Sequence, residues 1–221
     1  MPLSARASYQ YHERDLPILI FFPSFVLCLH SFVGIRVKEK HRHIPLPVQA
    51  SYRAPAPLLT SMPKYIYPIP IEQSDGRLLI VRRPRGGHDL GSDMKALRHE
   101  GVDILVSLLE RRESLALGLE MEEAMALRYG MRFINLPVPD YSVPAERASF
   151  NRIVLGLADA IGAGSQVAVH CHMSIGRSSL LAISILRRRG MDLDDAIALV
   201  QAARGARVPE TGEQLRWLQE G

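Results

Sequence analysis

Residues 170–179, His-Cys-His-Met-Ser-Ile-Gly-Arg-Ser-Ser, decide the fold of this chain. A mostly apolar run at 166–169 precedes them, and a second one at 180–186 follows. The first run predicts a short buried strand, and the second predicts a helix with an apolar face. The polar stretch is therefore expected to form a loop between a strand end and a helix N-terminus. Free backbone N–H groups and the helix dipole at such a place favour a bound anion.

Two residues of this loop, Cys171 and Arg177, are separated by five others. Five residues let the chain curl so that successive N–H groups point inward and form an anion nest. Arg177 can close the nest, because its planar guanidinium binds two oxygens of one phosphate. The same positive field favours the thiolate of Cys171, which is the nucleophilic form. The alternative, a buried structural cysteine, does not account for Arg177 or for the position of the loop between a strand and a helix. The stretch therefore predicts phosphate-ester chemistry through a cysteinyl-phosphate intermediate.

From about residue 62 to the C-terminus the chain resembles the cysteine-dependent protein tyrosine phosphatases, and most closely their small dual-specificity-like branch with its bacterial members. The resemblance implies that Cys171 attacks phosphorus, that Arg177 binds the phosphate, and that Ser178 stabilises the departing thiolate. It implies that His170 orients the loop and helps to keep Cys171 ionised. The remaining loop residues would bind the substrate phosphate with Arg177, namely His172, Met173, Ser174, Ile175 and Gly176. For His172, a surface position is equally compatible with the sequence.

The same resemblance implies an aspartic acid that protonates the leaving oxygen and later activates water. Residues 136–144, Leu-Pro-Val-Pro-Asp-Tyr-Ser-Val-Pro, supply it as Asp140, which lies ahead of Cys171 in the chain. The competing interpretation is an ordinary turn aspartate between two prolines.

The third residue after the cysteine departs from the family pattern, because the family most often has glycine where this chain has Ser174. If that position needs a positive φ, serine costs on the order of 1 kcal/mol and strains the loop. Serine does occur at this position in a related group of cysteine phosphatases, so we expect an intact loop, and the strain bears on the catalytic rate more than on the type of reaction.

Near the C-terminus, Gln214 has two interpretations. In related phosphatases a glutamine of a late loop positions the hydrolytic water. Thr211 and Gln214 also have the spacing of a capping box, in which the glutamine only satisfies backbone N–H groups at a helix start.

From residue 65 onward, strands alternate with helices. We expect strands at 65–71, 77–81, 102–108, 131–136 and 167–170, and helices at 90–99, 121–129, 145–161, 177–189, 193–204 and from 211. This order predicts an α/β fold with a central, mostly parallel twisted sheet flanked by helices. Both candidate chemical loops then follow strand C-termini, where open α/β sheets place ligands.

Composition excludes several classes of protein. Residues 62–221 contain twenty Lys or Arg and twenty Asp or Glu, so the expected phosphatase domain is electrically balanced and nucleic-acid binding has little support. Only two cysteines, Cys28 and Cys171, occur, and a reactive thiolate suits a reducing cytoplasm. We expect no cofactor and no metal, since the histidines of the first 61 residues lack a metal-binding pattern.

Residues 1–61 form an N-terminal extension that we expect to be disordered or not translated in nature, with the domain at 62–221. Within it, residues 16–35 contain no Asp, Glu, Lys or Arg, which makes them a candidate membrane segment. Pro17, Pro23 and His30 count against that interpretation. Membrane association is therefore the less favoured alternative, and a cytoplasmic location is expected.

The leading functional hypothesis is a phosphatase acting on phosphotyrosine, and on phosphoserine or phosphothreonine, in proteins. One alternative is a weakly active module that captures phosphorylated ligands, for which Ser174 is the only support. Another is a phosphatase for a small soluble phosphorylated metabolite. A lipid substrate is disfavoured, because the loop contains no lysine. The sequence leaves the physiological substrate and the oligomeric state open.

Overall fold

The computed structural model describes residues 65–221 with the exception of residue 73. The expectations for residues 1–61, including the candidate membrane segment at 16–35, lie outside these described residues. Among the helices that are described, none is long and apolar enough to cross a bilayer.

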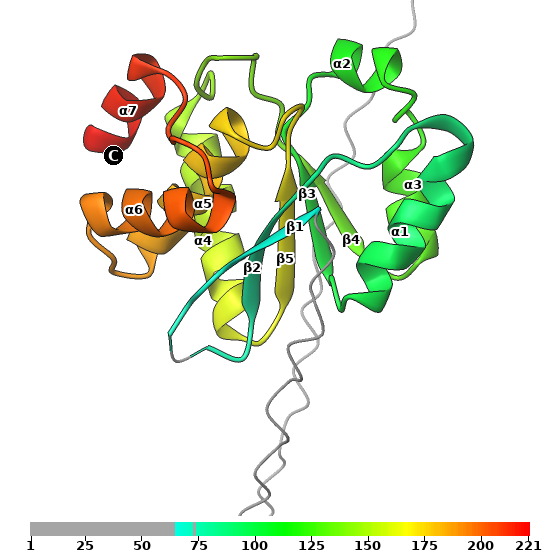
Figure 1. The fold of residues 1–221 in the computed structure, drawn as a ribbon, viewed down its shortest axis with the longest axis horizontal. Helices are drawn as coiled ribbons and strands as arrows, with labels where there is room; N and C mark the ends of the chain where they lie inside the picture. Colours follow the sequence, from blue (N-terminus) through cyan, green and yellow to red (C-terminus); the bar gives the residue numbers. More distant parts are fainter. Residues whose placement is uncertain (1–64, 73) are drawn as a thin grey trace, which may run out of the picture. The chain divides into compact units, whose positions relative to one another are not determined.

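The described chain alternates strands with helices, as the sequence predicts (Figure 1). Its strands are β1 Ile66–Ile69, β2 Arg77–Val81, β3 Ile104–Ser107, β4 Arg132–Asn135 and β5 Gln166–His170. Its helices are the short 3-10 helix η1 Gly87–Asp89 and the α-helices α1 Leu90–His99, α2 Arg111–Ala116, α3 Glu122–Arg128, α4 Arg147–Gly162, α5 Gly176–Arg188, α6 Leu193–Arg204 and α7 Gly212–Gln219.

The strands form one sheet in the order β1-β2-β5-β3-β4. Strands β2, β5, β3 and β4 are parallel, and only the edge strand β1 is antiparallel to its neighbour β2. The expected mostly parallel sheet is therefore confirmed. Because β5, β3 and β4 run in one direction side by side, the loops that follow them leave the same edge of the sheet.

Alternate residues of the central strands supply two hydrophobic layers. Leu78 and Ile80 of β2 pack in the layer that includes residues of α4, α5 and α6. Leu79 and Val81 pack in the opposite layer, with residues of α1 and α3. Figure 1 shows these helix groups on either side of the sheet. Burial of both sheet faces explains why the strands are apolar nearly throughout.

Several boundaries differ from the sequence expectation. Strand β3 is shorter than the expected 102–108, although Val102 and Leu108 are buried beside it. Helix α2 was not expected. Asp192 stands at the N-cap position of α6, but its side chain makes no capping hydrogen bond. The acidic first turn of α6, with Asp194 and Asp195, still complements the helix dipole.

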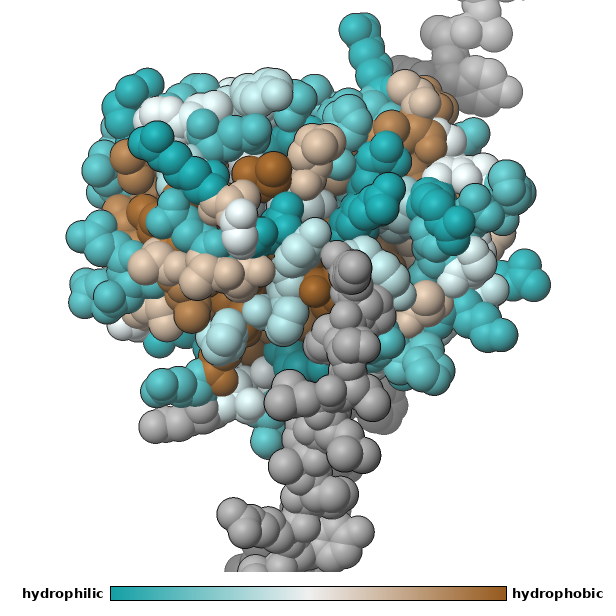
Figure 2. Space-filling view, viewed as in Figure 1, coloured by the Kyte–Doolittle hydropathy of each residue, from teal (hydrophilic) through white to brown (hydrophobic). Residues whose placement is uncertain are grey.

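The face seen in Figure 2 is largely hydrophilic, with hydrophobic side chains exposed in small patches. The buried apolar side chains of the described residues form the two layers against the sheet.

Candidate phosphate-binding site

The predicted loop lies between β5 and α5, at the C-terminal edge of the sheet. Strand β5 is fixed there by its parallel neighbours β2 and β3, and Leu108 donates its N–H to the carbonyl of His170 at 3.0 Å. Cys171 follows directly and is buried, with 2% of its surface exposed. The N-cap residue of α5, Ile175, makes no side-chain capping hydrogen bond, so its side chain leaves the first N–H groups of the helix available to an anion.

Ser174 occupies the turn of this loop in the left-handed conformation, with φ +55°. Its N–H donates to Sγ of Cys171 at 3.2 Å. The hydroxyl of Ser174 donates to the carbonyl of Val81 at 2.6 Å. The carbonyl of Ser174 accepts a hydrogen bond from Nε of Arg204, also at 2.6 Å. Three hydrogen bonds therefore hold this residue in a backbone conformation that costs a non-glycine residue about 1–2 kcal/mol.

Arg177, in the first turn of α5, is only 1% exposed. Its Nη1 donates to Oε2 of Glu113 at 2.7 Å and to the carbonyl of Val138 at 2.9 Å. Its Nη2 lies 2.9 Å from Oε1 of Glu113 and 2.9 Å from Oδ1 of Asp140. Its Nε is buried and has no acceptor among the described residues. A buried donor without a partner costs about 1–3 kcal/mol, so a bound oxyanion at Nε would recover that energy.

Glu113 is the carboxylate that orients the guanidinium. It belongs to α2, where it also accepts the N–H of Glu110 at 2.9 Å and so caps its own helix. Burial alone would raise the pKa of Glu113, but hydrogen bonds from Arg177 and from the Glu110 N–H lower this pKa below its ordinary value. Burial alone would lower the pKa of Arg177, but Glu113, Cys171 and Asp140 raise it. The pair is therefore ionised throughout the physiological range.

Asp140 reaches the same place from the loop after β4. Its side chain is 48% exposed and lies 2.9 Å from Arg177, at the mouth of the phosphate-binding loop. The backbone of this loop is fixed by Val138, whose N–H donates to Leu108 and whose carbonyl accepts from Arg177. The structure therefore brings Asp140 and Cys171, which are distant in sequence, close enough that both act electrostatically on one guanidinium.

His170 lies beneath the loop and is fully buried. Its Nε2 is 2.7 Å from Oε1 of Glu122 on α3, although the two atoms are not aligned as a hydrogen bond. Its Nδ1 is 3.4 Å from the carbonyl of Cys171. A buried carboxylate thus faces the ring that precedes the cysteine.

Gln214 is buried at the start of α7 and does not form a full capping box. Thr211 Oγ1 accepts the N–H of Gln214 at 3.1 Å, which is half of that motif. The side-chain Oε1 of Gln214 instead accepts from Glu210 N, and Nε2 donates to the carbonyl of Ser142 at 3.1 Å. Gln214 therefore ties α7 to the loop that carries Asp140. A Cβ at Gly176 would lie 3.1 Å from that same Nε2, so the amide also borders the phosphate-binding loop.

The other expected site residues lie at different depths. Ser178 is buried, and its hydroxyl has no partner among the described residues. His172 is half-exposed, with Nδ1 3.9 Å from Oε1 of Glu113. Met173 is 68% exposed and projects from the loop, whereas Ile175 is half-buried and packs against the hydrophobic core. Met173 is thus the loop side chain best placed to touch a substrate beyond its phosphate.

Ligand atoms of Glu113, Asp140 and His172 lie within 4.8 Å of one another, a spacing that a metal ion could bridge. Both carboxylates are bound to Arg177, whose positive charge opposes a cation at this point. An anion would instead reach the guanidinium through Nε, the donor that has no acceptor among the described residues.

Three residues of the site were missed in the sequence analysis: Glu113, Glu122 and Arg204. The position of Glu113 soon after a central strand was the one available signal, because such loops carry ligands. Nothing in the local sequence distinguishes Glu122 or Arg204 from solvated helix residues.

Comparison with known proteins agrees with this geometry. The family described as "Tc-R-P: Polymorphic toxin system, DSP-PTPase phosphatase" matches residues 81–191, half of the chain. No curated protein matches in sequence.

Among solved structures, kinase associated phosphatase with its catalytic cysteine changed to serine is 19% identical, with a TM-score of 0.64 over 72% of this chain and 94% of that one. Tk-PTP in its active form is 24% identical, with a TM-score of 0.59 over 72% and 97%. PTPMT1 in complex with PI(5)P is 19% identical, with a TM-score of 0.55 over 65% and 88%. At these identities the likeness shows a shared fold.

The family match covers β5, the phosphate-binding loop and α5, and the neighbouring structures share the sheet that positions them. The chain therefore belongs to the DSP-PTPase phosphatases, enzymes of the cysteine-dependent protein tyrosine phosphatase superfamily.

Proposed function

We propose that this phosphatase hydrolyses phosphate monoesters on proteins, on phosphotyrosine and on phosphoserine or phosphothreonine, through a cysteinyl-phosphate intermediate. The observation that carries the proposal is the guanidinium of Arg177. It is buried, lies near enough to Cys171 to be influenced by its charge, is held by Glu113, and has an Nε donor without an acceptor among the described residues.

Each of the candidate site residues has its own role in the proposed reaction. The thiolate of Cys171 attacks phosphorus, and the S–P bond forms as the bond to the ester oxygen breaks. Asp140 gives its proton to that leaving oxygen and then removes a proton from water, which attacks the phosphocysteine. Arg177 and the N–H groups of the loop bind the equatorial oxygens, and the hydroxyl of Ser178 stabilises the thiolate that leaves in the second step.

Replacement of the nucleophile tests the covalent step. Cys171→Ser should abolish turnover of p-nitrophenyl phosphate while vanadate still binds, because the cradle consists of backbone N–H groups and Arg177. Cys28→Ser is the matched control and should keep full activity. Acid quench of the wild type during turnover should recover phosphate attached to Cys171. Substantial turnover by the Cys171 variant would refute the mechanism.

The role of Asp140 is tested by leaving-group dependence. Asp140→Asn should slow hydrolysis of alkyl phosphates about 10²–10⁴-fold, the usual worth of general acid catalysis. The loss should be mild for p-nitrophenyl phosphate, whose leaving group needs little protonation. Asp194→Asn, an exposed aspartate of α6, should change neither rate. Equal losses of rate on both substrates would mean that a group other than Asp140 protonates the leaving oxygen.

The choice of substrate is tested by comparing kcat/KM for phosphotyrosine peptides, phosphothreonine peptides and phosphosugars. Higher values on the two peptides support a protein phosphatase, and a preference for phosphosugars would favour the metabolite alternative.

One observation favours a second candidate, a weakly active module that captures phosphorylated ligands. Ser174 stands at φ +55°, a conformation in which serine is strained. The hydrogen bonds to Val81 and from Arg204 offset that strain, and the working enzyme is therefore the better-supported proposal.

A further inference from the structure

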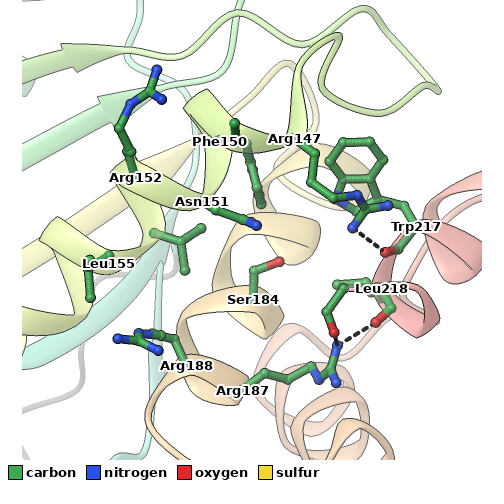
Figure 3. Close-up of a pocket in the computed structure, with 13 residues that line it drawn as sticks. Arg147, Phe150, Asn151, Arg152, Leu155, Ser184, Arg187, Arg188, Trp217 and Leu218 are labelled. Atoms are coloured by element: carbon green, nitrogen blue, oxygen red, sulfur yellow. Dashed lines mark hydrogen bonds between the residues drawn. The ribbon is translucent and has the colours of Figure 1, made fainter.

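A groove of about 540 Å³ lies between α4, α5 and α7, and none of its lining residues belongs to the phosphate-binding loop. Figure 3 shows Asn151 and Ser184 in its middle. Arg147, Arg187 and Trp217 stand toward the α7 side, and Arg152 and Arg188 stand at the opposite end near Leu155. Ser184 is eight residues along α5 from Gly176, about 12 Å at the rise of an α-helix. The groove is therefore separate from the catalytic site.

The groove is positively charged. Arginine supplies four of its lining side chains, and no lining residue is an aspartate or a glutamate. At the α7 end, Arg147 is stacked 3.6 Å over the ring of Trp217 and pairs with Glu220 at 3.4 Å. Arg187 donates to backbone oxygens of Leu218 and Gly221. These contacts hold that end in a fixed shape.

At the other end, neither Arg152 nor Arg188 has a carboxylate within 4.0 Å in the described part of the chain. Both are exposed, and Arg152 makes one side-chain contact, to the hydroxyl of Ser149 at 2.7 Å. Beside them the wall is apolar, with Leu155 exposed to 39%. Two guanidinium groups that lack a carboxylate partner in the described chain lie beside this apolar wall. They suit a ligand that carries carboxylates as well as an apolar side chain.

We infer that this groove binds an acidic segment of a partner protein, with carboxylates on Arg152 and Arg188 and an apolar side chain against Leu155. Residues 1–61 of this chain are an unsuitable occupant, because they carry seven Lys or Arg and only three Asp or Glu. The inference deepens the proposed function, on which it rests for its biological sense: acidic phosphoproteins would dock here while their phosphate enters the loop. Helix α4, which lines the groove, begins directly after the loop that carries Asp140, so the groove and the proposed acid lie on neighbouring parts of the chain.

The test measures binding apart from catalysis. The probe is a short fluorescein-labelled peptide of glutamates around a central phenylalanine, titrated with the full chain in the presence of vanadate to occupy the phosphate site. The groove variant is Arg152→Glu/Arg188→Glu. The matched control is Arg128→Glu/Arg132→Glu, an equal charge change at two exposed arginines of α3 and β4. Hydrolysis of p-nitrophenyl phosphate is measured for every protein.

We expect the groove variant to raise the Kd of the peptide about tenfold or more, since two charge pairs are replaced by two repulsions. The control should change the Kd less than about twofold, and hydrolysis of p-nitrophenyl phosphate should be equal in all three proteins. Equal weakening of peptide binding in both variants, or no peptide binding by the wild type, would contradict the inference that this groove binds an acidic segment. Binding of phosphatidylserine vesicles in place of the peptide would also overturn it, in favour of a membrane surface. Failure of hydrolysis in the wild type would refute the proposed function and leave the peptide result intact.

Discussion

At the scale of single residues, Ser174 combines a cost and a gain. The left-handed backbone disfavours serine by about 1–2 kcal/mol relative to glycine. Its hydroxyl, however, makes a buried 2.6 Å hydrogen bond to Val81, a contact that glycine cannot make. Loss of such a bond, which leaves a buried acceptor unsatisfied, costs about 1–3 kcal/mol. The two effects are similar in size, so this position need not weaken the enzyme.

Two substitutions separate these effects. Ser174→Ala removes the hydrogen bond and keeps the strain, so it should lower the free energy of unfolding by about 1–3 kcal/mol. Ser174→Gly removes both, so it should be more stable than the alanine variant by about 1 kcal/mol, with kcat/KM within about tenfold of the wild type. Denaturant unfolding and steady-state kinetics on p-nitrophenyl phosphate measure both quantities. A glycine variant clearly faster than the wild type would identify a handicapped loop and support the capture module.

Glu122 is the second residue with a testable contribution. Its carboxylate and the ring of His170 are both buried and lie 2.7 Å apart, and leaving a buried polar group without its partner costs about 1–3 kcal/mol. Glu122→Ala should therefore lower the free energy of unfolding by that amount, and Glu122→Gln should lower it less, because the amide keeps an acceptor for the ring.

The neighbour Glu123 is exposed and gives the control. Glu123→Ala should change stability by no more than about 0.5 kcal/mol. Equal small effects at both positions would mean that the contact between Glu122 and His170 contributes nothing to folding.

At the scale of elements, helix α2 links the sheet to the arginine. It has only six residues, and Glu113 both caps it and binds Arg177 through two oxygens. Glu113→Gln should keep the size of the side chain but lose the charge, and the guanidinium should shift. We expect kcat/KM to fall about 10²-fold, because misplacement near 1 Å has that effect. Glu120→Gln, at an exposed position beyond α2, should leave kcat/KM unchanged.

The same variant predicts a pH dependence. The pKa of Glu113 is lowered in the folded state. The ion pair of Glu113 with Arg177 therefore stabilises the protein fully when the pH is above the pKa that Glu113 has in the unfolded chain. That stabilisation is lost as the pH falls through the lowered pKa. The difference in unfolding free energy between wild type and Glu113→Gln should therefore be largest near neutral pH and shrink in acid. A difference that stays constant down to pH 3 would contradict the ion pair.

The elements differ in how far the sequence predicts them, for physical reasons. Strand β2 and helix α1 have the expected bounds, because turn residues and a change of period mark their ends. Helix α2 was missed, since a segment of six residues, four of them polar or charged, is too short to show a helical periodicity. Cys171, Arg177 and their loop follow from one local pattern, whereas the contact of Arg204 with Ser174 depends on packing that brings α6 onto the loop.

At the scale of the whole molecule, three neighbouring parallel strands assemble the site. Strands β5, β3 and β4 deliver Cys171, Glu113 and Asp140 to one edge of the sheet. Beyond them, α7 holds the Asp140 loop through Gln214, and α6 holds the phosphate-binding loop through Arg204. All of these parts lie within the described residues, so the chain from residue 65 onward contains every candidate site residue named above and both hydrophobic layers.

Because these residues all lie from residue 65 onward, the effect of removing the N-terminal extension can be predicted. A chain that begins at Met62 retains β1 and every contact described above, and its charges balance. We expect it to be soluble, with a melting temperature and a kcat/KM for p-nitrophenyl phosphate equal to those of the full chain. A chain that begins at Glu72 is the matched control. It lacks β1, which pairs with β2, and it lacks Tyr67, whose ring lies 3.8 Å from the Arg204 guanidinium that holds Ser174. This shorter chain should lose stability and activity together. An insoluble or inactive product from Met62 would show that residues 1–61 are part of the folded enzyme.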